Sequence, residues 1–322
     1  MSVSVIRLRR SLAASLGVLV IALLAFSCGP GAEYPSRPVE LIVPFGPGGA
    51  ADVAARQIAE LASEELGESI QVRNVTGGGG AVAYNEVVNA PNDGYTAIWS
   101  SAALNTLAAA GNIDFNYEAF EHVAIVSTET VTLAVAADSE WENLEDFIAD
   151  ARNRTPTVGN SGMGSTTHLT AVALAEEAGV EFEHVPFGDG LAIASVMGGE
   201  IDASVQHPAE IMSQYEAGDI RILAITSPER IETFEDVPTA QEQGVDVVLE
   251  QWRGISLPEG TDEEVIQRLE DAFTQAAETD EWAEFTRNTG ADVRIMGSEE
   301  ATEFIADMQQ QIDEIAAAAE EN

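Results

Sequence analysis

The sequence predicts an α/β protein made of two closely hinged lobes, and three observations support this prediction. Short apolar runs alternate with helical stretches from Val39 to Thr226, an order typical of α/β units with mainly parallel sheets. The 322 residues contain 45% apolar side chains, enough for two compact cores. After Trp252 the pattern changes to long amphipathic helices, which would return to the first lobe and make it discontinuous.

Residues 1–28 are typical of an export signal. Arg7, Arg9 and Arg10 precede an apolar stretch that is shorter than the ~20 residues of a membrane-spanning helix. Cys28 ends this segment and is the only cysteine, so no disulfide can form within the chain. We interpret Cys28 as the lipidation site of a lipoprotein, which predicts an exported chain in the periplasm or at the outer face of the cytoplasmic membrane. An ordinary cleaved signal with an incidental cysteine is the alternative.

The elements of the two lobes follow from the positions of the apolar runs and of the glycines that end helices. Many runs are rich in Val and Ile without strict alternation, as expected for strands covered on both faces. The predicted strands are Val39–Phe45, Ile70–Val75, Tyr95–Ser100, Val123–Val126, Thr130–Ala136, Thr157–Asn160, Phe182–Val185, Ile201–Val205 and Arg221–Thr226. The predicted helices are Ala51–Leu66, Ala81–Asn89, Leu144–Arg152, Thr166–Ala178, Ala192–Gly198 and Ala209–Ala217.

Two further helices are predicted at Thr261–Glu278 and Glu299–Glu321, the second with a continuous apolar stripe. Because the C-terminal helices are expected to pack back on the first lobe, the chain is predicted to have four parts. These are the signal (1–28), the first part of lobe 1 (29–125), lobe 2 (126–228) and the return to lobe 1 (229–322).

The charge balance is strongly acidic. The formal net charge is −41, and every basic residue is an arginine. Because phosphate binding needs clustered cations, nucleic acid is excluded as a partner. The sequence lacks the D-x-D-x-D-G pattern that would indicate a calcium-binding loop. The dispersed acids are best explained by a surface adapted to high salt, where mutual repulsion is screened.

The segment Val43–Arg56 predicts an anion site. A strand reaches Gly46-Pro47-Gly48-Gly49 and continues directly into a helix. The unpaired N–H groups at such a helix start point in the same direction as the positive end of the helix dipole. No Gly-Lys-Ser/Thr follows, so the loop is not a nucleotide P-loop. A small carboxylate is the expected ligand, held by backbone amides rather than by side-chain cations.

A second loop of the same kind lies at Asn160–Leu169. It carries two glycines and the hydroxyls of Ser161, Ser165, Thr166 and Thr167 before a helix. Helix capping needs only one hydroxyl, so the excess favours a role in ligand binding, with capping alone as the alternative. Two helix starts that face each other across a cleft would hold an anion between the lobes.

Signals for catalysis are weak. No Gly-x-Ser-x-Gly elbow is present, and the four histidines show no metal-ligand spacing. We therefore predict no catalytic residue, cofactor or metal, and interpret the Gly77–Gly80 cluster as a flexible turn. An α/β hydrolase using the same cleft is the runner-up interpretation, and a carboxylate sensor is the third.

Several segments, in order along the mature chain, resemble the TctC/Bug substrate-binding proteins, the extracytoplasmic receptors of tripartite tricarboxylate transporters. The resemblance rests on Tyr34–Pro38, Val43–Gly49, Asp52–Arg56, Gly77–Gly80, Pro91–Thr96, Ser161–Leu169, His184–Phe187, Gly199–Asp202, Leu223–Thr226, Asp236–Thr239 and Trp252–Gly254. It implies a two-lobed periplasmic-binding-protein fold of type II that closes on its ligand about a hinge. It also implies the membrane subunits of such a transporter as partners. We expect the receptor itself to be a monomer.

The resemblance also implies binding residues on both lobes. The first loop would contribute Phe45, Gly48, Gly49 and Ala50, whereas Asp52 is expected to cap the helix. The second lobe would contribute Ser161, Ser165, Thr166, His168, Phe187 and Asp202. His168 is either a ligand donor or a structural residue.

The segment Gly188–Leu191 departs from the family pattern because it contains an acid, Asp189. An acid at this position would repel a second carboxylate or accept an ammonium group. Tricarboxylates are therefore in doubt, and monocarboxylates, aromatic acids and acidic amino acids remain open.

Overall fold

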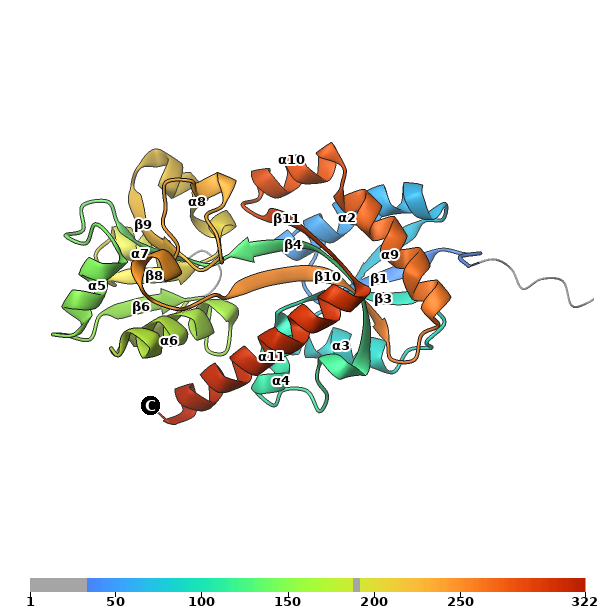
Figure 1. Cartoon of the computed structure of the whole chain (residues 1–322), viewed down its shortest axis with the longest axis horizontal. Coiled ribbons are helices and arrows are strands. Elements are labelled where there is room, and N and C mark those ends of the chain that lie inside the picture. The colour runs from blue at the N-terminus through green and yellow to red at the C-terminus, as the bar shows by residue number, and fades with distance from the viewer. Residues whose placement is uncertain (1–33, 188–191, 322) are drawn as a thin grey trace, which may run out of the picture. The chain divides into compact units, whose positions relative to one another are not determined.

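Two β-sheets with helices packed on them form the chain from Pro38 onward (Figure 1). The computed structural model describes residues 34–187 and 192–321. The export signal, Cys28 and the Gly188–Leu191 segment therefore lie outside the described residues.

The first sheet has six strands in the order β11-β4-β10-β3-β1-β2. In chain order these are β1 (Val39–Val43), β2 (Ile70–Asn74), β3 (Thr96–Ser101), β4 (Phe120–Thr130), β10 (Glu250–Pro258) and β11 (Asp292–Gly297). Strand β1 lies parallel between β2 and β3, whereas β10 runs antiparallel to β3 and β4. The carboxyl ends of β1 and β3 therefore meet at one edge of the sheet. In the strand order, β3 is next to β10 and β1 is the second strand from it.

Helices from both ends of the chain pack on this sheet. They are α2 (Ala50–Leu66), α3 (Ala81–Val88), α4 (Ala103–Ala109), α9 (Glu263–Ala277), α10 (Asp280–Asn288) and α11 (Ser298–Glu321). Helices α3 and α4 bury Tyr84 and Leu104 against β1 and β3, and α2 packs against α9. Ile305 and Ile312 of α11 pack against Trp252 of β10. The C-terminal helices thus return to the first lobe, as the sequence predicts.

The second sheet has five strands in the order β7-β6-β8-β5-β9. They are β5 (Thr132–Ala136), β6 (Thr157–Asn160), β7 (Glu183–Pro186), β8 (Ala203–Gln206) and β9 (Ile220–Ile225). Strand β6 is parallel to β7 and β8, and β5 is antiparallel to β8 and β9. Its helices are α5 (Leu144–Ala151), α6 (Thr166–Ala178), α7 (Ala192–Met197) and α8 (Pro208–Ala217). Four short 3₁₀ turns complete the described elements: Gly78–Gly80, Tyr117–Ala119, Glu232–Phe234 and Gln241–Gln243.

Two passages of the chain connect the sheets. The first passes from β4 to β5 through Val131, and the second enters β10 at Glu250. Val245 and Leu249 still lie in the core of the second lobe. Both passages therefore fall later in the chain than the boundaries at 125/126 and 228/229 that the sequence suggests. The second differs more because the segment between β9 and β10 packs in the second lobe although it contains only two short 3₁₀ turns and no longer helix or strand among the described elements.

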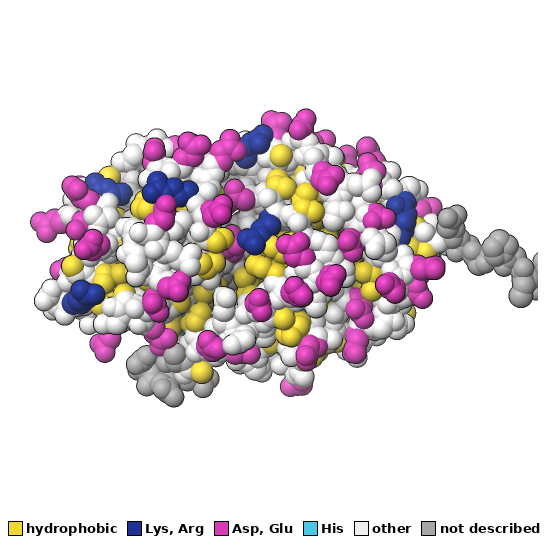
Figure 2. All heavy atoms as spheres, viewed as in Figure 1, with side chains coloured by type: hydrophobic (Ala, Val, Ile, Leu, Met, Phe, Trp, Pro, Cys, Tyr) yellow, Lys and Arg dark blue, Asp and Glu magenta, His cyan; other side chains and the backbone are white. Residues whose placement is uncertain are grey.

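Acidic side chains are spread over the face of the molecule seen in Figure 2, with few arginines between them. Several of these arginines are already paired with acids, for example Arg73 with Glu40 and Arg230 with Glu242. Among the described residues, no helix has the length and apolarity needed to cross a membrane. The face seen in Figure 2 therefore shows no cluster of arginines that would suit a polyanion.

Candidate functional site

The first predicted loop connects β1 to α2 and is exposed from Gly46 to Ala50. Gly49 is the N-cap of α2, and no side chain caps this helix. The first hydrogen bond of the helix runs from the Val53 N–H to the Gly49 carbonyl. The amides of Ala50 and Ala51 consequently have no partner among the described residues and are available to an anion.

Asp52 holds this loop in place. Its carboxylate accepts hydrogen bonds from the Gly48 N–H (2.8 Å) and from Asn74 (2.8 Å), and Asn74 also donates to the Phe45 carbonyl (3.0 Å). Arg56, one turn further along α2, pairs with Asp52 at 2.9 Å. The Arg56 guanidinium lowers the pKa of Asp52 to about 2; Gly48 and Asn74 act in the same direction, and burial opposes them. Asp52 is therefore a structural anion that fastens the loop.

The second predicted loop connects β6 to α6, and its polar groups bond mainly to one another. Ser165 is the N-cap of α6 and accepts from the His168 N–H (3.2 Å), while its hydroxyl donates to the Gly162 carbonyl (2.6 Å). The Thr167 hydroxyl accepts from the Ser161 N–H (2.9 Å). These bonds stabilise the turn itself, so capping accounts for more of this loop than the sequence suggests.

Two hydroxyls of this loop are not used within it. The Ser161 hydroxyl is buried and has no partner among the described residues. The Thr166 hydroxyl donates to Gln251 of β10 at 3.2 Å and so connects the two lobes. Within the described residues no hydrogen bond joins this loop to the first one. The ligand role of both loops remains a prediction.

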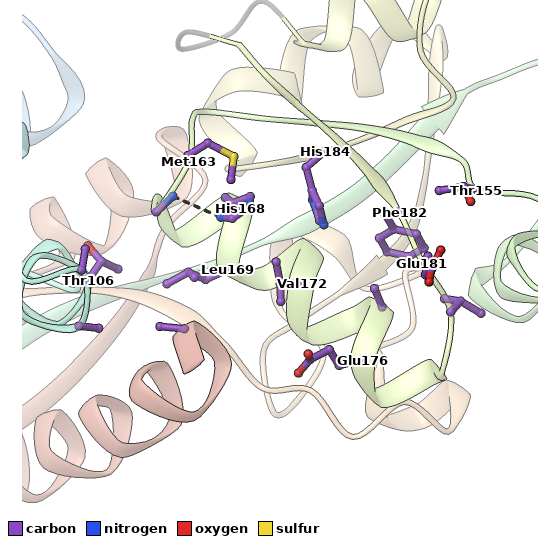
Figure 3. Close-up of a pocket in the computed structure, with 16 residues that line it drawn as sticks. Thr106, Thr155, Met163, His168, Leu169, Val172, Glu176, Glu181, Phe182 and His184 are labelled. Carbon is purple, nitrogen blue, oxygen red and sulfur yellow. Dashed lines mark hydrogen bonds between the residues drawn. The ribbon is translucent and has the colours of Figure 1, made fainter. Parts of the chain in front are cut away.

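His168 lies in the first turn of α6 and stabilises the second loop by a side-chain hydrogen bond. Its Nδ1 accepts a hydrogen bond from the Gly164 N–H at 3.2 Å, drawn as a dashed line in Figure 3. Its ring meets the ring of His184 edge to face, with centroids 4.9 Å apart. Burial, with a smaller effect of His184, lowers the pKa of His168 to about 4, so that the ring is neutral at pH 7.

The low pKa of His168 predicts a pH-dependent contribution to stability. The ring takes up its proton near pH 4 in the folded chain and near 6.5 when unfolded, so this contribution is complete above pH 6.5 and is lost towards pH 4. His168→Asn keeps an acceptor for Gly164 but does not titrate. Between pH 7 and 4, the wild type should lose about 1 kcal/mol more unfolding free energy than the variant. Urea unfolding at several pH values measures this difference, and parallel profiles would contradict the assignment.

A cavity of about 920 Å³ runs along α6 (Figure 3). His168 and Gly164 of the second loop line it, together with His184 and Phe182 of the second lobe and Thr106 of α4. No residue of the first loop contributes to it. This cavity therefore contains only part of the predicted site.

The remaining two predicted residues have different positions. The Phe187 N–H donates to the Asn160 carbonyl at 2.7 Å, which places Phe187 at the same sheet edge as Ser161. Asp202 lies at the opposite end of β6, where it accepts from the Thr157 N–H (2.8 Å) and pairs with Arg154 (2.9 Å). The prediction that Asp202 lies beside the other site residues is wrong, because β6 separates the two positions by its full length.

A buried ion pair of the first sheet, next to the second lobe, was not predicted from the sequence. Glu129, near the end of β4, accepts from Arg253 of β10, with Nε and a terminal nitrogen at 3.0 and 2.9 Å from Oε1. His207 of the second lobe lies 3.7 Å from Oε2. Burial alone would raise the pKa of Glu129, but Arg253 and His207 together hold it below its usual range. Their positions 124 and 78 residues apart in the chain leave no local pattern to find.

The comparisons with known proteins agree with this architecture. A family model described as "Tripartite tricarboxylate transporter family receptor" (TctC) matches residues 54–320. The chain belongs to this family. It is 29% identical to BugT of Bordetella pertussis over 282 residues, which cover 85% of this chain and 86% of BugT.

Two solved structures share the fold. A TctC solute-binding protein from Polaromonas without ligand superimposes with a TM-score of 0.83 at 31% identity, covering 89% of this chain and all (100%) of that one. MatC of Rhodopseudomonas palustris with bound malate gives a TM-score of 0.73 at 25% identity, covering 88% and 100%. The chain is thus a solute-binding receptor of the TctC family with the two-lobed periplasmic-binding-protein fold.

Proposed function

We propose that this TctC-family receptor captures a small carboxylate in a cleft between its lobes and delivers it to the membrane subunits of a tripartite tricarboxylate-type transporter. The export signal and lipidation at Cys28 would keep it, as a monomer, at the outer face of the cytoplasmic membrane. The malate bound to MatC is consistent with a carboxylate ligand.

The observation that carries this proposal is the uncapped start of α2. Side chains cap α5, α6, α9 and α10. Helices α2, α3 and α4 begin without a side-chain cap, but the N-caps of α3 and α4 are buried, whereas α2 begins at the exposed Gly49. The Asp52 network keeps the loop ordered without using the amides of Ala50 and Ala51. An ordered pair of free amides, the first on the exposed residue Ala50, at the positive end of a 17-residue helix fits one carboxylate group.

The strength of such a site is adequate for a transport receptor. Charge-assisted hydrogen bonds contribute about 1.5–3 kcal/mol each, and the helix end adds ~0.3–1 kcal/mol. A few such bonds support micromolar binding, near −8 kcal/mol, after the loss of ligand freedom. The two lobes would exclude water and supply the remaining contacts.

Thermal-shift screening against mono-, di- and tricarboxylates, aromatic acids and amino acids tests the proposal, together with mass spectrometry of solute that is retained through purification. We expect at least one carboxylate to stabilise the receptor and to be recovered unchanged. Stabilisation only by solutes without a carboxylate would contradict carboxylate capture. Chemical turnover of a stabilising acid would favour the hydrolase alternative.

A further inference from the structure

The cavity of about 920 Å³ along α6, which we call the α6 cavity, is bounded by both lobes. Ala109 of α4 and Ala316 of α11 line one side, and residues of α6 and β7 line the other. Leu169 of α6 packs in the same hydrophobic cluster as Ile305 and Met308 of α11, which holds the two sides together. The cavity is therefore preformed, and its volume lies in the range of ligand-binding pockets.

Three aromatic rings lie in a row along the α6 cavity (Figure 3). The rings of Phe182 and His184 meet edge to face with centroids 6.4 Å apart, and those of His184 and His168 do so at 4.9 Å. Leu169 and Val172 of α6 continue this surface, so that nine of the sixteen lining residues have apolar side chains. A row of rings beside aliphatic side chains favours an aromatic occupant, because aromatic pairs add to the gain from burial.

The charges of the lining argue against a charged occupant. None of the described lining residues is an arginine, and the chain has no lysine. The acids among them, Glu176 and Glu181, are exposed, so an ammonium group would gain little by pairing with them. Burial lowers the pKa values of His168 and His184, so both rings are neutral at pH 7 and carry no charge to pair with a carboxylate. An uncharged molecule therefore loses least on leaving water.

His168 provides a hydrogen-bond donor for such a molecule. Its Nδ1 accepts from the Gly164 N–H, so the neutral ring carries its proton on Nε2. This second N–H has no acceptor among the described residues, although the side chain lines the cavity and is only 5% exposed. An unpaired buried donor is destabilising, and a hydroxyl or carbonyl oxygen in the cavity would pair with it.

We propose that the α6 cavity is a second binding site, which takes an uncharged aromatic molecule with a hydroxyl or carbonyl oxygen. The aromatic body packs against the rings of Phe182, His184 and His168, and the oxygen accepts a hydrogen bond from Nε2 of His168. The site is separate from the start of α2, because no residue of the first loop lines the cavity. The inference therefore stands or falls independently of carboxylate capture.

Isothermal titration with compounds that share one carbon skeleton tests the chemical class. The probes are 2-naphthol, 2-naphthoate, 2-naphthylmethylammonium and the saturated alcohol 2-decalol. We expect 2-naphthol to bind at least about 10-fold more tightly than either charged compound, and at least about 3-fold more tightly than 2-decalol. Equal or tighter binding of a charged compound overturns the choice of an uncharged ligand. Equal binding of 2-decalol refutes the aromatic preference, and absence of 2-naphthol binding refutes the site.

Histidine NMR locates the bound compound in the molecule. The chain has four histidines, His122, His168, His184 and His207, of which only His168 and His184 line the cavity. In protein carrying nitrogen-15-labelled histidine, 2-naphthol should shift the ring resonances of these two through its ring current and the new hydrogen bond. His122, buried in the first lobe beside Ser256, should keep its resonances. Unchanged resonances of His168 and His184 at saturation place the compound elsewhere and overturn the inference.

Substitutions in the lining connect the affinity to the cavity. Ala109→Leu enlarges a half-buried lining residue and should weaken 2-naphthol binding at least about 10-fold. Ala149→Leu makes the same change on the exposed surface of α5, outside the cavity, and should leave the affinity within about 2-fold of the wild type. If both variants bind equally well, the cavity is not the site. His184→Leu removes one ring and should abolish the preference for 2-naphthol over 2-decalol; a preference that persists contradicts the role of the rings.

Discussion

Replacing Gly254 by alanine is expected to lower the free energy of unfolding by about 3 kcal/mol or more. Gly254 lies in β10, between β3 and β4. A Cβ atom at this position would overlap the carbonyl oxygen of Ala124 and lie 3.2 Å from the Cα of Ile125. These are backbone atoms of a paired strand, so relief requires the separation of two central strands. Urea unfolding followed by tryptophan fluorescence measures the loss.

Gly46→Ala is the matched control for this prediction. Gly46 has no atom within 4 Å of an added Cβ, and its φ angle does not require glycine. Its unfolding free energy should change by no more than about 0.5 kcal/mol. A loss below about 1 kcal/mol for Gly254→Ala would mean that β10 can shift against β4, and the rigid contact between these strands would be refuted.

The α/β units could be predicted from sequence because their signals are local. A strand that reaches a glycine-rich turn and continues into a helix describes both β1 to α2 and β6 to α6, and the structure confirms these pairs. The long helices α9 and α11 were equally evident from their apolar stripes. In each case the information lies within about twenty residues of chain.

Strands β10 and β11 were not predicted because their pattern depends on partners far away in the chain. Strand β10 is buried along its whole length, yet it contains Glu250, Gln251 and Arg253. Its polar residues are tolerated because partners meet them: Glu129 pairs with Arg253, and Arg294 of β11 pairs with Glu250. Polarity read locally therefore suggests a loop where tertiary contacts form a central strand.

The candidate site also depends on contacts between distant parts of the chain, which a local sequence pattern does not show. The first loop could be located from its glycines, but the role of Asp52 depends on Asn74, which lies on the neighbouring strand β2. Counting hydroxyls overestimated the number of free donors in the second loop, because the hydroxyls of Ser165 and Thr167 form hydrogen bonds within it. A sequence shows how many donors a loop has, whereas only the fold shows which of them remain free.

Replacing Gly49 by valine is expected to reduce the affinity for the best carboxylate of the panel by at least about 100-fold, the equivalent of losing one or two charge-assisted hydrogen bonds. Gly49 is extended, with φ −76° and ψ 168°, a conformation that suits a β-branched residue. An added Cβ meets only the Gly46 carbonyl oxygen at 3.5 Å, an ordinary contact. The two methyl groups would cover the approach to the amides of Ala50 and Ala51 without disturbing the fold.

Isothermal titration and thermal unfolding together separate obstruction of the site from loss of structure. Valine is a poorer N-cap than glycine, so the melting temperature should fall by no more than about 3 °C. Gly49→Ala should lose less affinity than Gly49→Val, because it adds one methyl group. Val53→Ala removes an exposed side chain from the same helix and leaves every amide in place, so its affinity should match the wild type. If Gly49→Val binds within about threefold of the wild type, the difference is below 1 kcal/mol and the start of α2 does not hold the carboxylate.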